Sequence, residues 1–174
     1  MRIHIIGSTH QTASLDTLRG ILDLLTADSA DEVTIDSRFF SYLMQHEIAP
    51  LGVKTYPLSG TIDTDLMVCI GGDGTFLRGA KLVAGTEAGI IGLNSGHLGF
   101  LSSMQPDVLS SYWEEIRSGR AQVDERATLE AVVTNPDGRV IYEGIALNEV
   151  SVIRRDILSM IRVTTKVCGQ WMVD

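Results

Sequence analysis

Cysteine is scarce in this chain: Cys69 and Cys168 are the only two, and they stand far apart. They form no CxxC pair, and no histidine lies at a spacing from them that suits a zinc site. Because such cysteine usage fits a reducing compartment, we expect a cytoplasmic protein. Cys69 lies inside an apolar run, which predicts a small side chain in the core.

Positive charge and long apolar runs are also in short supply. The chain has 14 lysines and arginines against 22 aspartates and glutamates, which gives a formal net charge of -8 and a pI near 4.9. This acidic balance argues against nucleic acid or an anionic membrane surface as a partner. No segment reaches the length of a membrane span, and the apolar start at residues 3–6 is too short for a signal peptide.

The most informative segment is Gly-Gly-Asp-Gly-Thr at residues 71–75. The preceding run, Leu66–Ile70, has no polar alternation and predicts a strand buried on both faces of a parallel sheet. Helical spacing follows at Phe76, Leu77, Ala80 and Val83. Gly72 and Gly74 are expected to allow positive φ and a close approach of the backbone to a ligand, while a helix start offers free N–H groups. This layout predicts a phosphate-binding loop.

Asp73 is the one carboxylate in this loop, which contains no lysine. A carboxylate beside bound phosphates adds negative charge, so binding alone does not explain it. It suits accepting a hydroxyl proton or holding Mg²⁺ during phosphoryl transfer. Arg78, in the first turn after the loop, is the nearest candidate cation. Two simpler interpretations compete: Asp73 caps the helix of a plain tight turn, and Arg78 is a solvated helix arginine.

The first part of the chain alternates strand and helix patterns, which predicts an α/β fold with a doubly wound parallel sheet. Strands are expected at residues 3–6, 33–35, 66–70 and 89–93, and helices at residues 14–26, 39–44, 76–83 and 106–117. Ligands bind such sheets at the carboxyl ends of the strands. Residues 71–75 and 94–101 each follow a strand directly, so we expect them to converge on one crevice.

The helical pattern stops after Gly119, where we place a domain boundary. Residues 1–119 are expected to form the α/β domain, and residues 120–174 the opening strands of an all-β second domain. Strand-like stretches at 123–134 and 139–153 flank Asn-Pro-Asp-Gly, a strong hairpin signal, and residues 160–167 are expected to pair with 170–173. Strands without partners leave open edges, so we expect copies of the chain to associate as a homo-oligomer.

The segment Gly-Gly-Asp-Gly-Thr is shared by NAD kinases, diacylglycerol-type lipid kinases and phosphofructokinases, and two further segments choose among them. Residues 94–101, Asn-Ser-Gly-His-Leu-Gly-Phe-Leu, resemble the NxGxLGFL loop of NAD kinases. Residues 146–149, Ala-Leu-Asn-Glu, resemble their asparagine-acidic motif. With three motifs in the family's order, the chain resembles the NAD kinase family.

The resemblance implies transfer of the γ-phosphoryl group of ATP, or of a polyphosphate donor, to the 2′-hydroxyl of the adenosine ribose of NAD, which gives NADP. It implies that Asp73 is the catalytic residue, which accepts or orients the hydroxyl proton, and that Mg²⁺ accompanies the donor. The nucleotide-binding residues expected from the loop chemistry and the resemblance are Gly72, Asp73, Gly74, Arg78, Phe100, Asn148, Glu149 and Ser159. From the residues alone, Phe100 is equally a core side chain, and Asn148 and Glu149 are ordinary strand and surface residues.

The resemblance to NAD kinases implies a protein of two domains, in which the second domain carries a further Asp-Gly and a Thr-Pro-Thr-Gly-Ser segment. Neither segment follows Glu149 here. We therefore expect an amino-terminal fragment of such a kinase, or a truncated product, with little or no activity by itself. Two other functions stay open. One is a non-catalytic nucleotide-binding or oligomerisation module of the same fold, and the other is a related kinase that acts on a lipid or a sugar phosphate.

Overall fold

A five-stranded parallel sheet forms the first part of the computed structural model, which describes residues 1–56, 62–94, 99–102, 104–156 and 158–172. The strand order is β3-β2-β1-β4-β5. The central strand β1 (Arg2–Gly7) lies between β2 (Glu32–Asp36) and β4 (Leu66–Ile70), with β3 (Lys54–Tyr56) and β5 (Gly89–Leu93) at the edges. The predicted α/β fold with a parallel sheet is confirmed.

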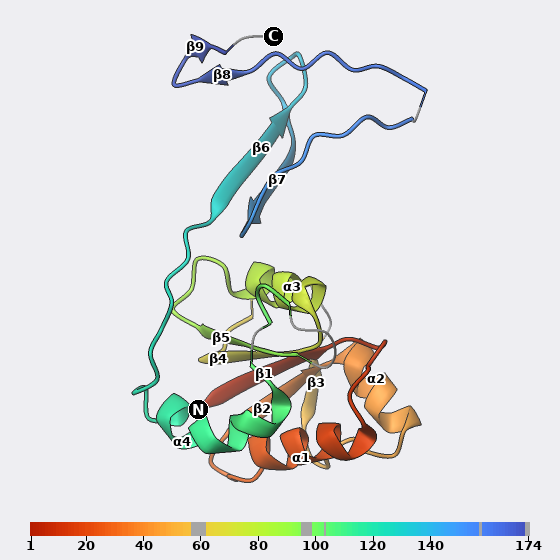
Figure 1. Ribbon diagram of the computed structural model, residues 1–174, viewed down its shortest axis with the longest axis vertical. Helices are drawn as coiled ribbons and strands as arrows, with labels where there is room; N and C mark the ends of the chain where they lie inside the picture. Colours follow the sequence, from red (N-terminus) through yellow and green to blue (C-terminus); the bar gives the residue numbers. More distant parts are fainter. Residues whose placement is uncertain (57–61, 95–98, 103, 157, 173–174) are drawn as a thin grey trace.

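Helices cover both faces of this sheet (Figure 1). One face carries α1 (Leu15–Leu25), α2 (Ser37–Gln45) and α4 (Leu109–Arg117), which follows a 3₁₀ turn, η1 (Pro106–Val108). The other face carries α3 (Asp73–Val83). Within the described residues, no helix is both long and apolar enough to cross a bilayer.

The side chains of each strand alternate between these two faces and so divide the core in two. Ile3 and Ile5 of β1 join the larger cluster with α1, α2 and α4, whereas Ile6 joins the smaller cluster beneath α3. Cys69 of β4 is fully buried in the smaller cluster, so its predicted role as a core side chain is confirmed. A Cβ on Gly79 of α3 would collide with the Cys69 sulfur, so a glycine at this position lets the helix lie close to the sheet.

An antiparallel hairpin of β6 (Leu129–Thr134) and β7 (Val140–Ala146) lies beyond α3 (Figure 1). Its turn is the predicted one: the Gly138 N–H donates to the carbonyl of Asn135 at 3.0 Å, and the Arg139 N–H donates to Asn135 Oδ1 at 2.8 Å. A second short hairpin joins β8 (Lys166–Val167) to β9 (Gln170–Trp171).

The strands of this second part are shorter than the sequence predicts. Residues 123–128 and 147–153 form no strand, because a strand needs a neighbour for its backbone hydrogen bonds and no described strand pairs with these stretches. Residue 173, predicted in the last strand, lies outside the described residues. The sequence also misses β3, since three residues carry too little pattern. The domain boundary at Gly119 stays a prediction.

His4 is an unexpected polar side chain in the middle of β1, fully buried. Its Nδ1 lies 2.7 Å from the hydroxyl of Thr34 on β2, and its ring meets the edge of Tyr56 from β3. Burial lowers the pKa of His4 to about 4, against a smaller opposing effect of the Asp36 charge. The imidazole is therefore neutral in the folded chain at neutral pH.

This burial predicts a pH dependence of stability. The unfolded chain, with a histidine pKa near 6.5, binds the proton before the folded chain does. The free energy of unfolding is therefore highest above pH 6.5 and falls toward pH 4, by up to about 1.4 kcal/mol per pH unit. Urea unfolding at about pH 7 and about pH 5 should show a smaller pH effect in His4→Leu than in the unchanged chain. A His4 ring that titrates near 6.5 in NMR spectra of the folded chain would contradict this.

Candidate functional site

The strand order reverses between β1 and β4, because the chain goes from β1 to one side of the sheet and later returns to the other. Ligands bind open parallel sheets outside the carboxyl ends of the strands at such a switch point. Gly7 at the end of β1 lies beside Ile70 at the end of β4. Gln11 Nε2 joins the two strand ends by donating to the carbonyls of Ser8 at 2.9 Å and Ile70 at 3.1 Å.

The loop at residues 71–75 begins at this point, and its glycines differ from one another. Gly71 has a φ of 153°, and a Cβ there would lie 2.6 Å from Thr75 Oγ1, so this position requires glycine. Gly72 has a φ of -85° and Gly74 is helical, so the expectation that these two use positive φ is wrong. A Cβ on either would meet nothing within 4 Å, and neither residue places a side chain over the start of α3.

Asp73 is the first residue of α3, with Gly72 at the N-cap position and no side-chain capping bond. The interpretation of Asp73 as a helix cap is therefore wrong. Its carboxylate instead accepts three backbone N–H groups from the segment that follows β5: Oδ2 from Phe100, and Oδ1 from Leu101 and Ser102, each at 3.0 Å. These bonds, that from Ser102 first, outweigh partial burial and lower the pKa of Asp73.

This contact brings residues 71–75 and part of the segment at 94–101 together, as their positions after β4 and β5 suggest. Sequence reasoning missed Gly99, Leu101 and Ser102 as part of the site. A Cβ on Gly99 would collide with Asp73 Oδ1, so the glycine gives the carboxylate access to the next three amides. The Gly-Phe-Leu sequence at residues 99–101 was the signal from which these residues could have been assigned to the site. Residues 95–98, including His97, lie outside the described residues.

Two of the predicted binding residues lie at this same edge of the sheet. Arg78 Nη2 donates weakly to the carbonyl of Gly7 at 3.4 Å and to Thr75 Oγ1 at 3.5 Å, so the guanidinium reaches from α3 to the end of β1. Phe100 is 96% exposed, so its interpretation as a core side chain is wrong. Its backbone is held by Asp73 while its ring faces solvent.

The other three predicted residues lie in the segment after β7. Asn148 and Glu149 are exposed and follow Leu147, which packs against the smaller core cluster beneath α3. Ser159 donates its hydroxyl proton to the carbonyl of Asp156 at 2.9 Å. Among the described residues, no hydrogen bond or ion pair joins any of the three to the glycine loop.

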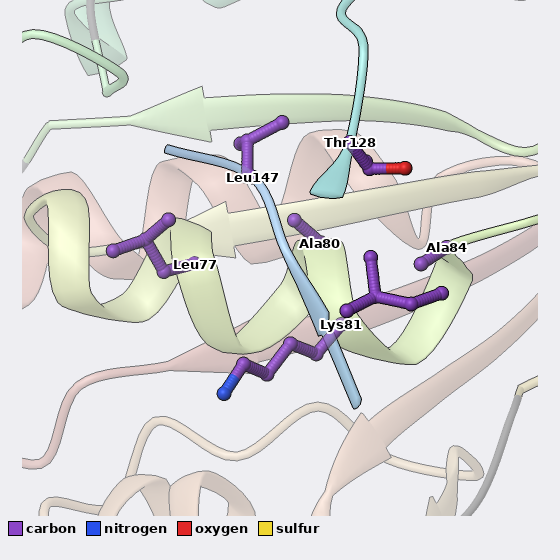
Figure 2. A pocket seen from close by; sticks show the side chains of 7 residues that line it. Leu77, Ala80, Lys81, Ala84, Thr128 and Leu147 are labelled. Atoms are coloured by element: carbon purple, nitrogen blue, oxygen red, sulfur yellow. The ribbon is translucent and has the colours of Figure 1, made fainter. Parts of the chain in front are cut away.

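A small hollow lies elsewhere, between α3 and the β6–β7 hairpin (Figure 2). Its lining combines one face of α3 and the residue after it with residues in or next to the hairpin: Leu77, Ala80, Lys81, Ala84, Thr128, Ile145 and Leu147. Its volume of about 30 Å³ is an order of magnitude below that of small-molecule sites. The hollow is therefore a packing seam, and the switch point remains the candidate site.

Comparison with known proteins gives similar proteins for this part of the chain. A family model described as "ATP-NAD kinase N-terminal domain" matches residues 57–121, which include both loops. An NAD kinase of Bacteroides fragilis is 32% identical over 171 residues, 97% of this chain and 57% of that protein. This chain belongs to the NAD kinase family.

Other members and a solved structure are similar over the same part. An NAD kinase of Christiangramia forsetii is 30% identical over 100% of this chain and 60% of its own length. The chain thus spans less than two thirds of these curated NAD kinases. A crystal structure of yeast NADH kinase complexed with NADH superposes with a TM-score of 0.70 at 22% identity, covering 85% of this chain and 47% of that one. This likeness shows the same fold.

The glycine geometry predicts opposite effects for one substitution at two positions. Gly71→Ala should lower the free energy of unfolding by about 1–3 kcal/mol, because alanine does not adopt this φ and its Cβ would crowd Thr75. Gly74→Ala, the matched control inside α3, should raise it by about 0.5–1 kcal/mol through helix propensity. Urea unfolding of both variants measures the difference. Equal effects would mean that Gly71 carries no conformational demand.

Proposed function

We propose that the chain is the nucleotide-binding part of an NAD kinase, which transfers the γ-phosphoryl group of ATP to the 2′-hydroxyl of the adenosine ribose of NAD. The observation that carries this proposal is an ionised carboxylate, Asp73, between two glycines at a helix start that lies at the switch point of the sheet. Polyphosphate is an alternative donor with the same reacting group.

The phosphates of a nucleotide would lie in front of α3. Gly72 and Gly74 present no side chain there, so the free N–H groups and the positive end of the helix dipole are accessible. Arg78 brings a cation to this edge, and its two long hydrogen bonds are weak enough to be exchanged for a phosphate oxygen. Local amides and one cation thereby bind an anion to an acidic chain.

Asp73 would orient the 2′-hydroxyl and accept its proton. Its lowered pKa keeps it ionised but also makes it a weak base, which favours orientation of the hydroxyl over early proton removal. Phosphoryl transfer proceeds through a loose transition state and asks the protein mainly for positioning and charge compensation. A weak but fixed acceptor is adequate for that task.

Mg²⁺ would enter with the phosphoryl donor. Mg²⁺ is usually bound through one or two carboxylates together with substrate phosphates and water. The described residues contain no group of three or more histidine, cysteine or acidic side chains that could hold a metal ion. The proposed metal ion is carried mainly by the phosphates of ATP and neutralises charge on the transferring group.

Asn148 and Glu149 are proposed to bind the ribose hydroxyls of NAD, and Ser159 a polar group of the nucleotide. The asparagine offers donors and acceptors and the carboxylate accepts from two hydroxyls, which suits a sugar. Leu147 packs beside α3 directly before them, so this segment is already joined to the helix that begins at Asp73. A cytoplasmic location, where NAD and ATP are available, stays a prediction.

A chimeric enzyme tests the proposed activity. The 174 residues replace the part of the Bacteroides fragilis NAD kinase that aligns with them, and NADP formation from NAD and Mg-ATP is measured. We expect turnover that requires both substrates, with the unmodified relative as the positive control. A folded chimera that forms no NADP would contradict the proposal.

Asp73→Asn in this chimera should lower kcat by about 10²- to 10⁴-fold, because the variant cannot accept the hydroxyl proton. Asp107→Asn, a conservative change of an exposed aspartate at the start of η1, is the matched control and should leave kcat unchanged. Near-normal turnover of Asp73→Asn would exclude the assigned role.

A second copy of the chain is the proposed partner of the β6–β7 hairpin. Leu129, Val133 and Tyr142 lie on one face by strand alternation and are each about half exposed, and each strand of the hairpin has one edge without a described neighbour. An apolar sheet face with open edges favours association. Light scattering of the 174-residue chain should show species larger than the monomer, reduced by Val133→Lys and unaffected by Asp137→Lys in the turn. A monomeric chain would exclude this partner.

A further inference from the structure

We infer that Asp73 is also a positioning residue: its carboxylate fixes the backbone of residues 100–102 and thereby holds the Phe100 ring where a nucleotide base can stack on it. We call the three hydrogen bonds from Phe100, Leu101 and Ser102 to this carboxylate the Asp73 clamp. The inference rests on the proposed function, because it concerns how the same site binds NAD.

The Asp73 clamp joins two segments that lie far apart in the sequence, and it adds to the bond from the Gly71 N–H to the carbonyl of Leu93 at 2.9 Å. Asp73 begins α3 after β4, and Phe100 follows β5, 27 residues later. Bonds from N–H groups to an ionised acceptor are shorter and about twice as strong as those to a neutral one. Three successive amides on one carboxylate therefore restrict this stretch of backbone much more than a single turn bond does.

The residues next to Phe100 anchor the stretch on the protein side. Ser102 is fully buried and Leu101 packs against the smaller core cluster, whereas the Phe100 ring is 96% exposed. The clamp thus fixes the backbone of a residue whose ring is free. A ring on a fixed backbone offers stacking area at a small cost in conformational entropy, and base stacking on an aromatic side chain tolerates any base.

The clamp leaves room for the proposed chemistry. A carboxylate has about four acceptor positions. Within the described part of the chain, the clamp uses two positions on Oδ1 and one on Oδ2. The remaining position on Oδ2 suits the hydroxyl of the substrate. Holding the stretch and orienting the hydroxyl are therefore compatible, and each bond of the clamp makes Asp73 a weaker base.

Amide hydrogen exchange of the 174-residue chain, followed by NMR without any ligand, tests the clamp directly. Asp73→Ala should accelerate exchange at Phe100, Leu101 and Ser102 by about 10- to 100-fold, the loss expected for bonds to a charged acceptor. Asp73→Asn should accelerate exchange most at the Phe100 amide. The carbonyl of the asparagine side chain can still accept from Leu101 and Ser102, whereas its NH₂ group faces the Phe100 N–H. A merely structural effect of the substitution would not produce this residue-specific pattern.

Gly99→Ala disrupts the clamp without removing the carboxylate of Asp73. Its Cβ would collide with Asp73 Oδ1 and displace the stretch, yet both Asp73 and the Phe100 ring remain in the chain. We expect faster exchange at the three amides and an NAD affinity about 5-fold or more weaker, as for loss of a stacking contact. Gly20→Ala, on the exposed side of α1 where a Cβ meets nothing within 4 Å, is the matched control and should change neither quantity.

A double-mutant cycle decides whether the clamp acts through Phe100. Calorimetric titration should show that Phe100→Ala lowers the affinity for NAD. The double variant Gly99→Ala/Phe100→Ala should bind NAD no more weakly than Phe100→Ala alone. Additive losses of NAD affinity in the double variant, or amide exchange rates that do not change in Asp73→Ala, would overturn the positioning role even if the chimera makes NADP. An unchanged chain that binds no NAD would instead count against the proposed function, while the exchange pattern still decides whether the clamp exists.

Discussion

A parallel sheet that is buried on both faces has polar chemistry available only at the ends of its strands, and the site of this protein depends on that constraint. β4 is apolar at all five positions and lies between two helical layers, so no charged group can be placed along it at low cost. Its carboxyl end is the first place where the backbone can turn toward solvent. The glycine loop, the start of α3 and the exit of β1 meet there.

The same constraint places a carboxylate beside the helix start at which we propose that phosphates bind. Asp73 lies at the positive end of α3 and receives three N–H groups from the stretch after β5, so its charge is compensated before any ligand arrives. This compensation keeps the group ionised and well oriented, at the expense of basicity. Such a group suits a reaction in which the protein positions reactants and stabilises charge more than it moves protons.

The second part of the chain follows a different logic. The β6–β7 hairpin meets α3 through Ile145 and the following Leu147, while much of its remaining apolar surface is exposed. A two-stranded hairpin is marginal in water by itself, so contacts beyond those within the hairpin must stabilise it. The seam with α3 supplies one such contact, and the open face is where others would form. Because α3 carries Asp73 at its first residue, packing on this helix also bears on the site.

The sequence by itself determined the elements whose pattern is local. The apolar run Leu66–Ile70, the periodic helix at residues 14–26 and the turn at Asn135 were all predicted, because side-chain alternation, capping and turn chemistry act over a few residues. The three motifs likewise led to the NAD kinase family. Strand ends after Gly119 were not predictable, since a strand extends only as far as a neighbour pairs with it.

Only the tertiary structure decided what Asp73 contacts and which way Phe100 points. Phe100 is a large apolar residue of the kind that usually lies in a core, but it is exposed, whereas its neighbours Leu101 and Ser102 are partly and fully buried. The sequence placed Asp73 in a turn, where capping its own helix was the simplest role. Its partners lie 27–29 residues away, in the segment that follows the adjacent strand, and no local pattern encodes that distance. Long-range contacts of this kind exist only once the parallel sheet has placed β4 and β5 side by side.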